Sequence, residues 1–169
     1  MPPATTSPGQ AHWLCVQCPR GVLHKPVPYG DPPNISALLQ DWSALIQGAG
    51  PNRDSVAFLA TKHALVSGSW VASVHRAMID EAWAVVCRAT LSGQLGVFSR
   101  CSTRSLSSEH HMIHVTTWSF LDVMDVHRVR QQLQSLGFNE ALTYRPDIYN
   151  YLGVYPENRW GLQVALFTV

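Results

Sequence analysis

Three stretches with apolar residues at helical spacing, each followed by a glycine, limit what this chain can fold into. The first is the clearest: Asn34 supplies an N-cap, apolar residues recur at intervals of three and four over residues 35–46, and Gly48 provides a stop. This pattern predicts an amphipathic helix with an aromatic residue, Trp42, near its middle.

The other two helical stretches follow the same rules. One starts at Met78, carries Asp80 and Glu81 in its first turn and ends at Gly93. The other spans residues 123–136 and ends at a glycine. The residues expected to bring the three helices onto the sheet are Trp42, Trp83 and Val129.

Short stretches with strand-like patterns lie between the helices. They cover residues 11–18, 55–60, 69–75, 95–101, 110–118, 141–145 and 160–169. No glycine-rich phosphate loop follows any of them, and two of them flank the polar turn STRSLSSE, as in a hairpin. These features favour an α+β fold, with a sheet covered on one face, over a doubly wound α/β fold.

Length and composition indicate one domain. The chain has 169 residues, of which 46% are hydrophobic and 14% charged, enough for a sizeable core. We expect residues 1–10, MPPATTSPGQ, to form a flexible N-terminal segment and residues 11–169 to form a single domain. The net charge of +1 argues against a broad nucleic-acid or membrane surface, so any such binding must be local.

Cysteine usage and hydropathy favour a cytoplasmic protein. The four cysteines follow no signal peptide and belong to a chain too long to need disulfides, so we expect reduced thiols. No apolar run approaches the roughly 20 residues of a membrane-spanning helix, so no membrane partner is expected.

Metal and redox sites are not expected. His110 and His114 share a face if their segment is a strand, but two imidazoles without a third ligand are too few for zinc. Cys15 and Cys18 make half of a zinc knuckle and have no partner pair. No spacing requires a nucleophile beside a base, so we expect no cofactor and regard an enzyme as the third choice of function.

The aromatic C-terminal stretch YRPDIYNYLGVYPENRWGL, with SGSWVASVHRAMIDEAWAVVCRATLSGQLGVFSR and IHVTTWSFLDVMDVHRVRQQLQSLG, carries a family resemblance. The last two segments resemble the mRNA cap-binding translation initiation factors of the 4E type. The whole of residues 35–169 is most similar to the basophilic leukemia expressed protein family, which shares that fold, and the aromatic stretch is its specific part. The resemblance implies a curved, mainly antiparallel sheet with about three helices on its convex face.

The resemblance also implies an anion site on the concave face. Arg100 matches a phosphate-binding arginine, and Arg104 with His110 or His111 lies where further basic residues are expected; of the two histidines, His111 is taken as the anion contact. Arg145 is added because guanidinium groups bind phosphate in a bidentate manner, and Tyr144 or Trp118 could stack on a base. The expected function is therefore a binding module for a phosphorylated nucleotide or RNA end.

Cap binding itself is not expected. In the cap-binding factors two tryptophans sandwich the methylated base beside a glutamate, and the segment LATKHALVSG lacks that Trp-Glu pair. The loss of each of the two stacking rings removes about 1–3 kcal/mol of binding free energy.

Two further readings stay open. The exposed helix faces and residues 119–125 could dock a protein, which makes a scaffold the alternative function. The aromatic stretch could pack into the core, since rings bury much surface whatever their function.

Overall fold

A computed structural model describes residues 1–19, 33–103, 108–140 and 142–168. Its six strands form one antiparallel sheet in the order β1-β3-β4-β2-β5-β6. The strands are β1 Trp13–Gln17, β2 Gly68–His75, β3 Phe98–Ser102, β4 His110–Thr117, β5 Thr143–Pro146 and β6 Phe167–Thr168. The long central strands β2 and β4 pair over their whole lengths.

The described part of the chain also contains five helices. They are α1 Ile35–Gln47, α2 Arg53–Lys62, α3 Ile79–Leu91, α4 Val123–Ser135 and α5 Ile148–Leu152. The expected α+β class, with a curved antiparallel sheet and helices on one face, is confirmed. The three helices predicted from apolar spacing all form close to their predicted limits.

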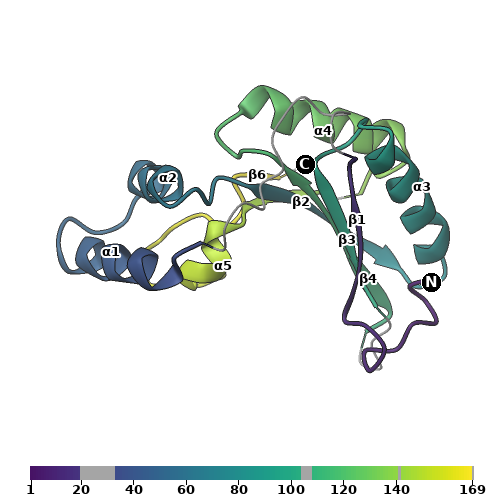
Figure 1. Ribbon diagram of the computed structural model, residues 1–169, viewed down its shortest axis with the longest axis horizontal. Helices are drawn as coiled ribbons and strands as arrows, with labels where there is room; N and C mark the ends of the chain where they lie inside the picture. The colour runs from purple at the N-terminus through teal and green to yellow at the C-terminus, as the bar shows by residue number, and fades with distance from the viewer. Residues whose placement is uncertain (20–32, 104–107, 141, 169) are drawn as a thin grey trace.

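Helices α3 and α4 lie over one face of the sheet (Figure 1), which we call the helix face. Trp83 of α3 and Val129 of α4 are buried there, as predicted. Trp70 of β2 is also fully buried, and its indole N–H donates a hydrogen bond to the Val126 carbonyl oxygen, 2.9 Å away. Together these contacts fix α4 across the centre of the sheet.

Helix α1 lies to one side of the sheet, next to α2 and α5 (Figure 1). Its Trp42 is buried, but the ring meets Trp160 edge to face, with centroids 5.0 Å apart. The sequence pattern predicts that α1 packs on the sheet together with α3 and α4. The structure gives α1 a different set of neighbours because the aromatic C-terminal stretch returns to cover Trp42.

Residues 55–60 were predicted as a strand, and this was wrong: they belong to α2. Asn52 caps the helix with a capping box, in which its side chain accepts from the Ser55 N–H and the Ser55 hydroxyl accepts from the Asn52 N–H. A short apolar run does not by itself separate strand from helix. The cap at Asn52 was the signal that decides it.

The C-terminal region also differs from prediction. Within the described residues 160–168, only Phe167–Thr168 form a strand, which pairs with Tyr144 and Thr143 of β5. Residues 148–152 form the short helix α5, which no sequence pattern predicted.

The first ten residues contain tight turns and contact the start of α3. The Ala4 N–H donates to an Asp80 carboxylate oxygen at 2.9 Å, and Thr6 is buried. These contacts seat the segment beside α3, while its flexibility in solution stays a prediction. Among the described helices, none is long and apolar enough to cross a membrane.

Candidate anion site on the open side of the sheet

The face of the sheet opposite α3 and α4 carries two of the predicted arginines. Arg100 of β3 pairs with His114 of β4, and cross-strand partners share a face. Arg145 of β5 lies opposite Ser69 of β2, which lies opposite Thr116 of β4. Since Thr116 and His114 are two residues apart on one strand, all five side chains lie on the same side.

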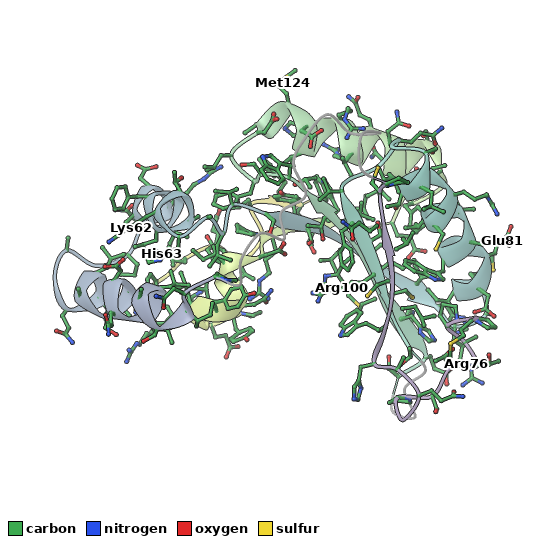
Figure 2. The ribbon with its side chains drawn as sticks, viewed as in Figure 1. Lys62, His63, Arg76, Glu81, Arg100 and Met124 are labelled. Atoms are coloured by element: carbon green, nitrogen blue, oxygen red, sulfur yellow. The ribbon has the colours of Figure 1, made fainter. Side chains whose placement is uncertain are left out.

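We call this side the arginine face. It is defined by Trp13, Arg100, His114 and Arg145. Figure 2 shows Arg100 on the side of the strands away from Glu81, which lies on α3.

Arg100 stacks on an aromatic ring. Its guanidinium carbon lies 4.5 Å from the ring centroid of Trp13 on the edge strand β1. The same ring meets His114 edge on, with centroids 5.3 Å apart and planes at 88°. A guanidinium held over a ring keeps its edge N–H groups free to bind an anion.

Arg145 is held by the segment after α5. One of its terminal N–H groups donates to the Val154 carbonyl oxygen at 2.6 Å, and its guanidinium carbon lies 5.1 Å from the Tyr155 ring centroid. Its Nε is buried and has no hydrogen-bond partner among the described residues. Burial lowers the pKa of Arg145 from its ordinary value.

The two arginines act on the same imidazole. Burial first, and then the positive charges of Arg100 and Arg145, lower the pKa of His114 from 6.5 to about 4. His114 is therefore neutral at pH 7. This ring could donate one hydrogen bond and accept another without adding to the positive charge of the face.

Asp147 lies beside the arginine face at the start of α5. Its carboxylate accepts hydrogen bonds from the hydroxyls of Ser67 at 2.7 Å and Ser69 at 3.0 Å, and the Ser69 hydroxyl also meets that of Thr116 at 2.9 Å. Burial raises the pKa of Asp147, while the two hydroxyls and the charges of Arg100 and Arg145 act in the opposite direction. These bonds tie β5 and α5 to the central strands and fix the backbone that carries Arg145.

Two of the predicted site residues point to the other face. His111 lies opposite Val74, is 2% exposed, and its Nδ1 is 2.8 Å from the Ser102 carbonyl oxygen. Tyr144 lies opposite Trp70 and is 0% exposed. Their proposed roles in anion contact and in stacking were wrong, because each side chain points to the helix face and is enclosed there.

The other two candidates have different outcomes. Arg104 lies outside the described residues. Trp118 lies in a bend just after β4 and is half-buried, so stacking by its ring stays a prediction.

Sequence reasoning missed Trp13 and the role of His114. The segment 11–18 was identified as a strand, but its place beside β3 depends on long-range pairing that no local pattern reveals. The alternation of His110, Met112 and His114 on one side of β4 was predicted, and it could have shown that His114, rather than His111, faces Arg100.

The described residues contain no group of three or more His, Cys, Asp and Glu side chains that could hold a metal ion. None of the four cysteines, all of them in the described part of the chain, forms a disulfide; Cys15 is exposed while Cys18 is buried.

Comparison with known proteins identifies the family. The model of the family described as basophilic leukemia-expressed protein Bles03 matches residues 50–153, well over half of the chain. This chain belongs to the Bles03 family. The match includes the strands that carry Arg100, His114 and Arg145, and ends just after α5.

Solved structures similar to this Bles03 family member include translation factors. A schistosome eIF4E complexed with m7GpppA and 4E-BP has 11% identity and a TM-score of 0.48, over 61% of this chain and 58% of that one. The Ascaris suum eIF4E-3 complexed with an m2,2,7G cap has 13% identity and a TM-score of 0.47, over 63% and 59%. The chain thus spans less than two thirds of the solved structures it matches, and no residue role is carried over at these values.

Proposed function

We propose that this Bles03 family member is a binding module that holds a phosphorylated nucleotide or an RNA end on its arginine face. The observation that carries the proposal is that Arg100 and Arg145, from strands separated by β4 and β2, lie on one face of the sheet together with His114. The positive charges of both arginines, after burial, lower the pKa of His114. Two guanidinium groups acting on one neutral ring favour an anionic ligand between them.

The spacing favours an extended ligand over a single phosphate. Arg100 and Arg145 stand on strands three places apart in the sheet order, so their backbones are separated by roughly 14 Å. One phosphate cannot span that separation, whereas a nucleotide with several phosphates, or the end of an RNA, offers anionic oxygens at more than one point. The Trp13 ring beside Arg100 offers an apolar surface for a base.

The low net charge agrees with a local site. At +1 overall, the chain has no excess of positive charge to hold nucleic acid generally. The lack of a disulfide among its four cysteines also supports the cytoplasmic location that we propose.

The proposal is tested by titrating cap analogues, mono- and dinucleotides and short RNAs while tryptophan fluorescence is recorded. We expect saturable quenching that weakens as salt is added, because phosphate contacts release counterions. Arg100→Ala and Arg145→Ala should each abolish it. Arg76→Ala is the matched control, since Arg76 pairs with Glu109 at 3.2 Å outside the site.

Quenching of equal strength in Arg100→Ala, or no response of the native protein to any of these ligands, would contradict the proposal.

A second candidate function, protein docking through the helices, is favoured by exposed apolar side chains at the start of α4. Met124 is 81% exposed, and Leu121 and Val123 lie beside it. Partner binding that survives Arg100→Ala but is lost in Met124→Arg would support this second function.

A further inference from the structure

A second arginine–ring pair lies at the other end of the arginine face. The Arg145 guanidinium carbon is 5.1 Å from the Tyr155 ring centroid, just as that of Arg100 is 4.5 Å from the Trp13 ring centroid. Both rings keep accessible surface, since Trp13 is 38% exposed and Tyr155 is 51% exposed. Each pair therefore offers a cation for a phosphate and a ring for a base.

The turn that carries Tyr155 is fixed by hydrogen bonds. The Asn158 side-chain amide donates to the carbonyl oxygens of Tyr155 at 3.0 Å and Leu162 at 2.8 Å, and its oxygen accepts from the Leu162 N–H at 3.0 Å. Within the turn Glu157 has a φ of 64°, which is uncommon for a residue other than glycine. The bonds of Asn158 stabilise this conformation, so the Tyr155 ring is in place before a ligand binds.

Arg145 is tied to the same turn. One of its terminal N–H groups donates to the carbonyl oxygen of Val154, the residue before Tyr155, at 2.6 Å. Val154 is fully buried, and its N–H donates to the Tyr149 carbonyl oxygen at 3.0 Å. The pair of Arg145 and Tyr155 is therefore held from both sides, by strand β5 and by a buried segment.

Polar and neutral side chains separate the two arginine–ring pairs. The His114 ring and the hydroxyls of Ser69 and Thr116 lie between them on the same face. None of the described strand residues on this face is acidic. The carboxylate of Asp147, beside the face, accepts hydrogen bonds from two serine hydroxyls. A chain of phosphates can therefore cross the face from one arginine to the other.

The separation of the rings determines how long the ligand must be. Trp13 stands on β1 and Arg145 on β5, four strand spacings away, or roughly 19 Å across the sheet. A mononucleotide has one base and can use only one of the two rings, however many phosphates it carries. An extended strand of about four nucleotides, the shortest site of common single-strand-binding modules, reaches both.

We propose that the arginine face binds single-stranded RNA of about four nucleotides, with one base on Trp13 and another on Tyr155. Phosphates of the intervening backbone contact Arg100 and Arg145. This inference rests on the proposed function and narrows its ligand from a phosphorylated nucleotide to a segment of RNA. The new part of the site is the Tyr155 ring.

The probes are oligouridylates of one to four nucleotides, each with a 5′ phosphate, titrated into the full chain in a calorimeter. We expect the affinity of the native protein to rise at least about tenfold from one nucleotide to four, because a second base finds a ring. Tyr155→Leu should lose most of this gain, since leucine offers no flat face to a base. Tyr155→Phe should keep the gain because it keeps the ring.

Tyr151→Leu is the matched control. Tyr151 is 44% exposed on α5 and, within the described part of the chain, stacks on no arginine. Its substitution should leave the length dependence as in the native protein. Because Tyr151 and Tyr155 are both exposed, both leucine variants should unfold at about the native urea concentration.

Tetranucleotides that lack one terminal base connect the Tyr155 ring to a particular base. They keep every phosphate, so the electrostatic contribution to binding is unchanged. For one of the two ends, we expect removal of the base to weaken binding to the native protein about tenfold. The same removal should weaken binding to Tyr155→Leu by no more than about twofold, because the base and the ring act as a pair.

A tetranucleotide that binds the native protein no better than the mononucleotide would overturn this inference and leave the proposed function standing. The same conclusion would follow from an equal length dependence in Tyr155→Leu and the native protein, or from base-removal losses that are equal in both. Binding of none of the probes to the native protein would contradict both this inference and the proposed function.

Discussion

The guanidinium carbon of Arg100 lies 4.5 Å from the centre of the Trp13 ring, on the edge strand of the sheet. This contact makes Trp13 the tryptophan expected to report on ligand binding. It also holds Arg100 in one place before a ligand arrives.

Trp13→Leu should remove most of the ligand-induced fluorescence change. Calorimetry should show that the same ligand still binds. Its binding free energy should be less favourable by about 0.5–1 kcal/mol, because the cation–π contact is missing. Trp118→Phe is the informative comparison, because the sequence proposed Trp118 as a stacking ring. Loss of the signal in Trp118→Phe, with an unchanged signal in Trp13→Leu, would contradict the assignment.

Tyr144 belongs to the core. Its hydroxyl lies 2.6 Å from that of Thr117, which also donates to the Gly68 carbonyl at 3.3 Å. Tyr144→Phe removes one buried hydrogen bond, so the free energy of unfolding in urea should fall by about 1 kcal/mol. Ligand binding should be unaffected. A variant of native stability that had lost ligand binding would restore the stacking role that the structure denies to Tyr144.

Gly96, just before β3, lies too close to the backbone of Thr116 for any side chain to fit. A Cβ at this position would overlap the carbonyl oxygen of Thr116, which accepts from the Val97 N–H at 2.9 Å. Gly96→Ala should therefore destabilise the fold by about 1–3 kcal/mol, as overpacking does. Gly9→Ala is the control, because an added Cβ there meets only Ser7 Oγ at 4.0 Å. Thermal unfolding that is the same for both variants would refute this close approach.

His114 should make stability depend on pH. Its pKa is 6.5 in the unfolded chain and about 4 in the folded protein, so between these values the unfolded state holds more protons. The contribution is complete above about pH 6.5, is lost as the pH falls towards 4, and amounts to at most about 3 kcal/mol. His114→Gln should lose less stability than the native protein between pH 7 and pH 4. Asp147, whose raised pKa acts in the opposite direction, is present in both proteins and cancels in the comparison. Parallel pH profiles would show that His114 is not held neutral.

Local sequence signals predicted most of the helices and strands, but not which other elements they pack against. The caps and glycine stops located α1, α3 and α4, and alternation located β2 and β4, because these features act within a few residues. The placement of α1 beside Trp160 and of β1 beside Arg100 depends on contacts between residues distant in sequence, which periodicity does not encode.

The site shows the same limit. Arg100 and Arg145 were chosen by residue type and resemblance, and both lie on the arginine face. His111 and Tyr144 were chosen in the same way and are buried on the other side, because a shift of one residue along a strand reverses the face. The strand register alone determines that His114, and not His111, faces Arg100.

The most direct test of the proposed site is the pKa of His114, measured by NMR from its ring protons. In Arg100→Ala and in Arg145→Ala the pKa should rise from about 4 towards 6.5, since each variant removes one of the positive charges that lower it. Saturating guanosine 5′-diphosphate should also raise it in the native protein, while Arg76→Ala should leave it unchanged. A pKa that neither arginine variant nor the nucleotide alters would contradict a shared anion site on this face.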